Sequence, residues 1–330
     1  MNHTPLRFFS EFHDRTVLFR AGRVIFTTYG LLVGGAFFVG LTASSAYVAA
    51  IGIDPSLFAR FVPLALFAVL LGARAASAAA DWRHVLADPL GALIRPGFFM
   101  HGGIAGGGLA ALGYCWWTGV DPLVWCDALG FCMPIGEALC RIGCYVYGCC
   151  WGRPSAGPFG VCYTSPDAAV VREKSSHQGV RLHPAQLYAT VAHGAQFALF
   201  LALLPHKPFD GFFAGLYLVT HPLLRFFLET FRDDHRGSVG GKLTHTQLYS
   251  GIQLLLGAVC LAGSALREHN HATEKSFLDA VSGTLGQPTV LTTILGGALT
   301  VVLAFGVHFG RVGSWLTPAS KPRPNLLTQA

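Results

Sequence analysis

The sequence predicts an all-α polytopic membrane protein, a bundle of about seven to eight transmembrane helices with a polar extramembrane lobe. Three observations support this class. Of the 330 residues, 52% are hydrophobic and 12% are charged, about half the charged fraction of an ordinary soluble domain. Apolar segments of bilayer-crossing length recur along the chain. Many of the 40 glycines lie inside these segments, which suits close helix packing in lipid.

We expect a helix at each of eight apolar segments, because a bilayer crossing needs about 20 residues. They are roughly residues 24–50, 57–80, 97–118, 122–147, 186–204, 210–230, 246–266 and 288–310. The fourth segment contains Asp127, Glu137 and Arg141. These side chains are too polar to face lipid, so this helix must face the protein interior or a water-filled cavity.

The remaining segments define the expected domain organisation. Residues 1–22 form an N-terminal amphipathic segment at the interface, without a cleavable signal peptide. Residues 23–266 form the membrane domain, in which 148–185, rich in Gly, Pro and Ser, is interpreted as the extramembrane lobe. Residues 267–330 contain a loop over 267–287, an additional transmembrane helix and a loose tail.

The formal net charge of +6, much of it outside the apolar segments, favours contact with anionic lipid and not with nucleic acid. The side of the membrane that holds the N-terminal segment and the loops at 81–96, 148–185 and 231–245 carries most of the lysines and arginines. The positive-inside rule places that side in the cytoplasm. If the arginines instead hold lipid phosphate, the charge bias is functional and this orientation does not follow.

His101 opens a glycine-rich run at the start of the third segment, with Gly102 and Gly103 next to it. A histidine at this position can accept a proton near neutral pH. The glycines allow a second backbone, or a lipid, to approach closely. The alternative is a small-residue packing face with a histidine at the membrane interface.

Arginines at membrane depth suggest an anionic headgroup, because a guanidinium group matches phosphate oxygens. Glu137 and Arg141 are four residues apart and can pair on one helix face. Arg225, Glu229 and Arg232 recur at i, i+4 and i+7, so we expect them on one stripe of the sixth helix, as a cradle for phosphate. The alternatives are a structural ion pair and arginines that extend to the membrane surface.

Two further groups of residues have less specific patterns. His183, Gln186 and Tyr188 begin the fifth segment, where they can bind a headgroup or belong to an ordinary interfacial belt. The nine cysteines are an odd number, which is a poor disulfide framework. Cys140 and Cys144 can share a helix face as part of a metal or redox cluster, but small apolar packing residues are the favoured interpretation.

Taken in order, these residues resemble the prolipoprotein diacylglyceryl transferase family over roughly residues 22–266. The similarity rests on a set of short motifs with shared order and spacing. They are Tyr29-Gly30, Gly72-x-Arg74, Ala87-Asp88-Pro89, His101-Gly102-Gly103, Arg141-Ile142-Gly143, Gly152-Arg153-Pro154, His183-Pro184-x-Gln186-Leu187-Tyr188, Arg225-Phe226-x-x-Glu229-x-x-Arg232 and Gln247.

The resemblance implies a bacterial inner-membrane enzyme, usually of seven spans, whose lobe and first terminus face the periplasm. It also implies two partners, phosphatidylglycerol and a lipoprotein precursor with a cysteine-bearing lipobox. The diacylglyceryl group passes to the cysteine thiol and glycerol phosphate leaves, which requires neither a metal nor another cofactor.

The family's activity is tied most closely to the residues that match His101, Arg141 and Arg225. Here His101 is the expected base for the thiol. Arg141 and Arg225 are expected to hold the departing phosphate. The expected binding residues around them are Tyr29, Gly102, Gly103, Gly152, His183, Gln186, Tyr188, Glu229 and Arg232.

The sequence departs from the family at several positions near the expected substrate pocket. Cys144 replaces the usual asparagine, and Cys149-Cys150 replace a frequent acidic residue. Ser77 stands near an expected aromatic residue, and Ala189 near an expected acidic one. Two alternatives therefore stay open: a paralogue with the same donor and another acceptor, or a non-catalytic lipid-binding protein.

Overall fold

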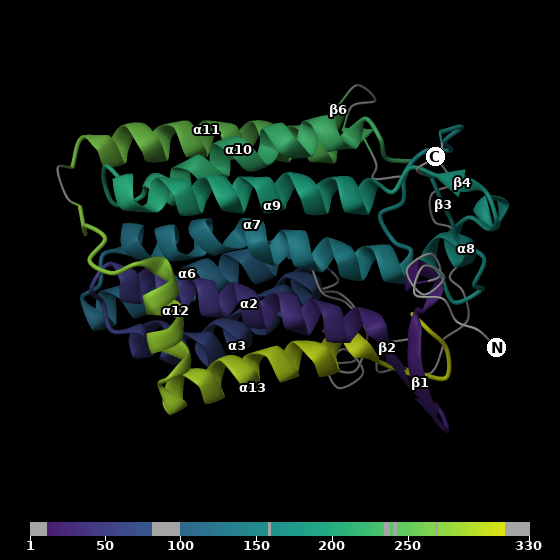
Figure 1. Cartoon of the computed structure of the whole chain (residues 1–330), viewed down its shortest axis with the longest axis horizontal. Helices are drawn as coiled ribbons and strands as arrows, with labels where there is room; N and C mark the ends of the chain where they lie inside the picture. The colour runs from purple at the N-terminus through teal and green to yellow at the C-terminus, as the bar shows by residue number, and fades with distance from the viewer. Residues whose placement is uncertain are drawn as a thin grey trace.

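The computed structural model describes residues 12–80, 100–157, 160–233, 238–239, 243–267 and 270–313. Within these ranges, eight α-helices have 18 residues or more (Figure 1). They are α2 (Thr28–Ala50), α3 (Pro55–Ala80), α6 (Met100–Thr118), α7 (Pro122–Tyr147), α9 (Ala185–Leu203), α10 (Phe212–Glu229), α11 (His245–Ala265) and α13 (Pro288–Gly306). Their ends agree with the predicted segments to within four residues.

Six of these helices are long and apolar enough to cross a membrane, namely α2, α3, α7, α9, α11 and α13. The helices α6 and α10 have similar lengths and lie in the same bundle (Figure 1). Large apolar side chains point outward, with Leu109 71% exposed and Trp116 88% exposed. Exposed apolar surface of this kind suits lipid and not water. The prediction of an all-α polytopic membrane fold is confirmed.

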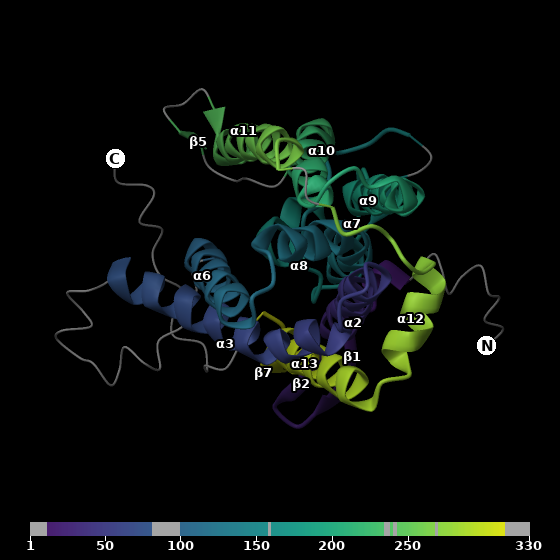
Figure 2. The ribbon, with the colours of Figure 1, turned by 90° about the vertical axis from the view of Figure 1, so that its left-hand side faces the viewer.

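Helix α7 lies at the centre of the bundle, in contact with α2 on one side and with α9 and α10 on the other (Figure 2). Its interior face carries the large buried side chains Trp125 and Phe131. Around this centre, α3 packs against α6, α10 against α11, and α13 against both α2 and α3. The central position of α7 explains how it can contain the charged residues that the sequence places there.

Asp127 of α7 is fully buried, as predicted for a residue too polar to face lipid. Its carboxylate accepts hydrogen bonds from the backbone N–H groups of Gly211 (2.8 Å) and Ala214 (2.9 Å). The Lys207 ammonium group lies 3.8 Å from the same carboxylate. Asp127 therefore satisfies the free N–H groups at the start of α10 and balances the buried lysine.

Backbone contacts between close helices explain several glycines. A Cβ atom on Gly106 would lie 2.4 Å from the Ala68 carbonyl oxygen, and one on Gly102 would lie 2.4 Å from the Gly72 carbonyl oxygen. The glycines therefore let α6 and α3 touch along their backbones. The predicted role of this glycine run in close helix packing is confirmed.

Small β-strands, which the sequence pattern does not predict, join the two ends of the described chain. Strand β1 (Val17–Ala21) pairs with β2 (Val24–Thr27), and β2 pairs with β7 (Val307–Phe309), all antiparallel. Of the expected amphipathic N-terminal segment, residues 1–11 lie outside the described residues, and residues 17–22 belong to a hairpin. The extra C-terminal helix α13 ends in a strand of the same sheet, which ties it to the membrane domain.

The predicted loop at 267–287 is also more ordered than expected, because it contains α12 (Phe277–Leu285). Ser276 caps this helix by accepting a hydrogen bond from the Asp279 N–H (3.2 Å). Its apolar face packs on the end of α2, where Ala280 is buried against Ala46 and Ala50. The periodic apolar residues are too few to stand out from a nine-residue segment in the sequence.

The predicted lobe lies at one end of the bundle (Figure 1). It has a small core of its own. It contains α8 (Ala169–Glu173) and the hairpin of β3 (Val161–Cys162) with β4 (Arg181–Leu182). Tyr163 and Leu182 are fully buried within it. A further short hairpin pairs β5 (Ser238–Val239) with β6 (Leu243–Thr244) before α11.

Candidate functional site

Three of the sequence motifs meet where the lobe joins the bundle. Gly152 forms a β-bridge with Arg232, and the Arg153 N–H donates to the Phe231 carbonyl oxygen (2.9 Å). On its other side, the Arg153 carbonyl oxygen accepts a hydrogen bond from the His183 N–H (2.9 Å). The short segment at Gly152-Arg153 therefore lies between the ends of α10 and α9, like the middle strand of a sheet.

Gly152 is required by this close approach. A Cβ atom at this position would lie 2.4 Å from the His183 carbonyl oxygen and 2.8 Å from the Phe231 carbonyl oxygen. Both neighbours are backbone atoms that belong to the pairing itself. No larger residue fits without moving the strands apart.

Arg141 and Arg225 lie near the lobe ends of two helices in contact, α7 and α10. Arg225 is buried, and its Nη1 lies 2.5 Å from the Glu229 carboxylate. Arg141 is partly buried and within electrostatic range of Arg232. Arg141, Arg225, Arg232 and Glu229 thus lie at the same end of the bundle, together with Arg153, whose Nε donates to the Arg232 carbonyl oxygen (3.0 Å).

The structure corrects two details of the predicted ion pairs. Helix α10 ends at Glu229, so Arg232 does not lie on its stripe but in the bridge to Gly152. The Thr230 hydroxyl donates to the Phe227 carbonyl oxygen (2.7 Å), which helps to end the helix there. The predicted Glu137–Arg141 ion pair is absent from the described residues, because Glu137 has other partners.

Glu137 instead joins three helices in the middle of the bundle. Its carboxylate accepts a hydrogen bond from the Tyr217 hydroxyl (2.9 Å) and lies near His193 Nδ1 (3.2 Å) and His221 Nε2 (3.4 Å). His221 Nδ1 in turn contacts Gln253 Oε1 of α11 (3.3 Å). The sequence analysis missed this cluster. Histidines inside apolar segments are the signal that could have found it.

The predicted residues at the start of α9 position the chain around Gly152. His183 Nδ1 lies 3.2 Å from the Tyr188 hydroxyl. The buried Gln186 amide donates to the Cys149 carbonyl oxygen (2.7 Å). Gln186 and His183 thereby fix both sides of the turn that follows α7.

Tyr29, near the start of α2, faces the end of α7. Its ring packs against Tyr147, with centroids 4.9 Å apart. It also lies close to Gly143, where a Cβ atom would come within 3.3 Å of the ring. The thiols of Cys144 and Cys149 are within electrostatic range of its hydroxyl. Tyr29 therefore belongs to the group of residues around Arg141.

Three cysteines also converge beside Arg141. The Sγ atoms of Cys144, Cys149 and Cys150 all lie within 4.8 Å of one another. Hydrogen bonds with the Cys144 and Cys150 thiols, together with burial, raise the pKa of Cys149 well above its ordinary value of 9.0. The sequence favoured small packing residues here, whereas the structure gathers these three thiols into a cluster that could hold a metal, with Cys140 hydrogen-bonded to Cys144 beside it.

The sequence matches the prolipoprotein diacylglyceryl transferase family over residues 16–262, which covers more than half of the chain. The chain belongs to this family. The prediction made from the motifs is confirmed, and the matched range contains every predicted site residue.

Several relatives are called phosphatidylglycerol–prolipoprotein diacylglyceryl transferase. The protein from Azospirillum brasilense is 30% identical over 264 residues, which cover 76% of this chain and 94% of the relative. That of Rhodospirillum centenum is 32% identical over 213 residues, 62% of this chain and 74% of the relative. That of Clostridium tetani is 29% identical over 163 residues, and the match spans 49% of this chain and 61% of the relative.

The role of His101 as the base that takes the thiol proton stays a prediction for this diacylglyceryl transferase family member. His101 belongs to the first turn of α6, but its side chain lies outside the described residues. Gly102 and Gly103 lie against α3, with Cβ positions 2.4 Å from Ala76 Cβ and 3.2 Å from Val69. These contacts explain both glycines by helix packing, and a role in binding substrate stays untested.

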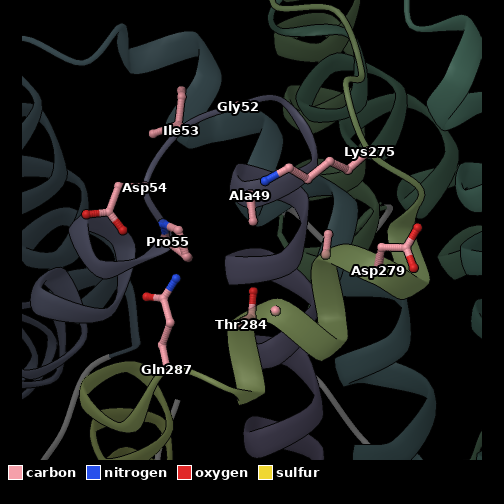
Figure 3. Close-up of a pocket in the computed structure, with 11 residues that line it drawn as sticks. Ala49, Gly52, Ile53, Asp54, Pro55, Lys275, Asp279, Thr284 and Gln287 are labelled. Carbon is pink, nitrogen blue, oxygen red and sulfur yellow. The ribbon is translucent and has the colours of Figure 1, made fainter.

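A pocket of about 320 Å³ lies at the other end of the bundle (Figure 3). It is formed where α2 turns into α3 and α12 packs against this turn. Asp54, Lys275 and Asp279 are among its lining residues. The pocket lies at one end of α2 and Tyr29 at the other, so the length of a membrane-spanning helix separates them. The pocket is therefore distinct from the site around Arg141 and Arg225 of this diacylglyceryl transferase family member.

Proposed function

We propose that the protein transfers the diacylglyceryl group of phosphatidylglycerol to the cysteine thiol of a lipoprotein precursor that carries a lipobox. Glycerol phosphate is the second product, and the reaction takes place in the bacterial inner membrane. The observation that carries the proposal is the family match over residues 16–262. The position of Arg141 and Arg225 at the same end of two packed helices supports it.

The proposed reaction is a nucleophilic displacement at a glyceryl carbon. The acceptor thiol gives its proton to His101, and the resulting thiolate forms a bond to carbon. The bond from that carbon to the phosphate oxygen breaks, and the electron pair leaves with glycerol phosphate. Arg141 and Arg225 stabilise the charge on this leaving group.

The surrounding side chains position these groups. Glu229, 2.5 Å from Arg225, holds that guanidinium in one orientation. Gly152, His183 and Gln186 keep the turn after α7 close to the end of α10. The phospholipid headgroup is then held in one orientation, with its glyceryl carbon placed for attack by the thiolate. This orientation raises the rate of transfer, because less entropy is lost in reaching the transition state.

Release of glycerol phosphate tests the proposal. The full-length chain, purified in detergent, is mixed with phosphatidylglycerol and a peptide that contains a lipobox cysteine. We expect glycerol phosphate and a lipidated peptide in equal amounts. Arg141→Ala and Arg225→Ala should each lower kcat/KM by about 100- to 1,000-fold, the effect of losing one donor to a developing anion.

Arg20→Ala is the matched control, because Arg20 is exposed and pairs with Asp167 on the lobe surface (2.9 Å). It should retain full activity. Absence of both products from a folded, monodisperse preparation of the native chain would refute the proposal.

A second candidate is a paralogous transferase with the same donor and a different thiol acceptor. The cysteine trio at residues 144, 149 and 150, which replaces usual family residues, favours this alternative. Consumption of phosphatidylglycerol with a non-lipobox thiol, and none with the lipobox peptide, would establish it in place of the first.

A further inference from the structure

The cysteine trio has the dimensions of a zinc site. The Sγ atoms of Cys144, Cys149 and Cys150 lie within 4.8 Å of one another. Tetrahedral zinc with Zn–S bonds of about 2.3 Å separates its sulfur ligands by about 3.8 Å. Each sulfur therefore needs to move by about 1 Å or less to reach this geometry.

The backbone holds the trio in place at some cost in free energy. Helix α7 ends at Gly148, which has a φ of +75°, and the chain reverses immediately. Cys150 has a φ of +59° and is the one residue other than glycine with positive φ in the described part of the chain. Such strain of about 1 kcal/mol or more persists where the surrounding structure demands it, often at functional sites. Simple apolar packing does not require this conformation.

We propose that Cys144, Cys149 and Cys150 bind one zinc ion and leave its fourth position open to the acceptor thiol. Three thiolates and Zn²⁺ have a net charge of −1. Arg141, whose Nη1 lies 3.8 Å from Cys150 Sγ, balances that charge. Cys149 and Cys150 are only partly buried, so a thiol can approach the fourth position.

The described residues contain a second cluster of metal-ligating groups, Glu137 with His193 and His221. One oxygen of the Glu137 carboxylate already accepts a hydrogen bond from Tyr217, and His221 already contacts Gln253. In the cysteine trio, by contrast, the Cys149 thiol is a weak donor in a long contact with the Cys144 carbonyl oxygen (4.0 Å). The Arg141 guanidinium donates to Cys150 Sγ (3.8 Å), an arrangement that favours a thiolate.

The role of the zinc rests on the proposed transfer reaction. An acceptor thiol that binds the open position loses its proton, because a coordinated thiol is deprotonated. That proton passes to the base of the proposed reaction. The zinc-bound sulfur then forms the bond to the glyceryl carbon, and the carbon–oxygen bond to phosphate breaks with its electron pair on the leaving group. Arg141 thus links the two reactants, since it contacts Cys150 of the metal site and holds the phosphate in the proposed reaction. Zinc keeps its oxidation state throughout.

Metal analysis of the full-length chain tests the site without measuring activity. The chain is purified in detergent with reductant and without chelator, then given zinc and desalted. We expect about one zinc ion per chain, as for any three-thiolate site. Replacement by Co²⁺ should give a thiolate-to-cobalt charge-transfer absorption. A Cys149→Ser/Cys150→Ser double variant should lose both signals by at least about tenfold.

Cys162→Ser/Cys260→Ser is the matched control, because these two cysteines lie outside the trio, and it should bind metal like the native chain. Thermal unfolding of both variants establishes that they fold. Chelation of the native chain should remove the metal, and zinc should restore it. Equal metal content in the two double variants would overturn the proposal, as would a disulfide within the trio of the unreduced chain.

The open position has its own test. A lipobox peptide with cysteine should shift the cobalt spectrum, and the same peptide with serine should not. An unchanged spectrum with both peptides would overturn the acceptor-binding role. Full transfer activity in the zinc-free chain would also overturn that role and leave the proposed function intact. Stoichiometric zinc without any transfer would leave the site intact and remove the proposed function.

Discussion

At the residue scale, the site depends on a few positions where no other side chain fits. Gly152 is the clearest of them, because carbonyl oxygens from two different segments approach its Cα. Glu229 has a different role, as the carboxylate that orients the buried Arg225. Gly152 is required because a larger side chain does not fit, and Glu229 because of its charge. A substitution of Gly152 should therefore lower stability and activity, whereas one of Glu229 should lower activity alone.

Gly152→Ala should lower both stability and activity. The new Cβ atom would lie 2.4 Å from the His183 carbonyl oxygen, so the paired segments must separate. We expect a loss of about 1–3 kcal/mol in the free energy of unfolding and a clear loss of glycerol phosphate release. Gly157→Ala is the control, since among the described residues its Cβ would meet only Ser155 Oγ, at an ordinary contact distance of 3.5 Å. Equal melting temperatures for the two variants would contradict this account.

Glu229→Gln should lower the rate and leave the fold intact. The amide keeps the shape of the side chain but loses the charge that holds Arg225. A loss of about 1.4–2.7 kcal/mol in transition-state stabilisation from a misoriented Arg225 corresponds to roughly a 10- to 100-fold drop in kcat/KM. Steady-state kinetics and a thermal melt measure the two quantities. Wild-type kinetics in the variant would show that Arg225 needs no such partner.

At the scale of helices, the sequence predicts positions well and neighbours poorly. Each long helix is visible as an apolar segment, because lipid requires continuous helical hydrogen bonding. The contact of Glu137 with His193 and His221 joins α7, α9 and α10. No local pattern predicts it, because which faces meet depends on the whole bundle. The same limit applies to the cysteine trio, which forms because the chain reverses at Gly148.

Helix α6 offers a matched pair of glycines that tests how it is held. A Cβ on Gly106 would lie 2.4 Å from the Ala68 carbonyl oxygen, whereas a Cβ on Gly108 would meet no atom of the described residues within 4 Å. Gly106→Ala should therefore destabilise the protein by about 1–3 kcal/mol and displace the helix that carries His101. Gly108→Ala should leave the melting temperature unchanged or slightly raised, since alanine favours helix. The prediction fails if both variants melt alike in detergent.

At the scale of the whole molecule, the lobe is attached to the bundle by charge as well as by backbone pairing. Asp233, directly after Arg232, accepts from the Lys174 ammonium group (2.7 Å) and contacts His177 Nε2 (3.0 Å). The hydrogen bond with Lys174, followed by that with His177, lowers the pKa of Asp233 below its ordinary value of 3.8. The folded state thus favours the charged carboxylate.

This interaction should make the attachment of the lobe sensitive to acid. A carboxyl group with a lowered pKa contributes its full stability above the ordinary pKa, and this contribution is lost as the pH falls through the folded-state pKa. We expect Asp233→Asn to melt below the native chain by a constant margin from about pH 7 to about pH 5. The margin should shrink as the pH falls below about 4. A margin that does not change with pH would exclude this role for the carboxylate.

The sequence alone predicts the class of fold, the helices, the lobe and the family. It also predicts correctly that Asp127 lies inside the bundle. It does not predict the pairing of β2 with β7, because strand partners such as Phe26 and Val307, which are 281 residues apart, leave no local signal. The catalytic assignments of His101, Arg141 and Arg225 come from motifs, and the assays described above decide them.

The pairing of β2 with β7 has a consequence for how the protein is made. Gly30 and Gly34 of α2 lie directly against α13, and the Thr27 hydroxyl donates to the Gly306 carbonyl oxygen. During synthesis, α2 enters the bilayer long before α13 is made, so this face stays uncovered until residues 288–306 have been translated and inserted. A nascent chain stopped before residue 288 would expose that bare glycine surface to membrane proteases.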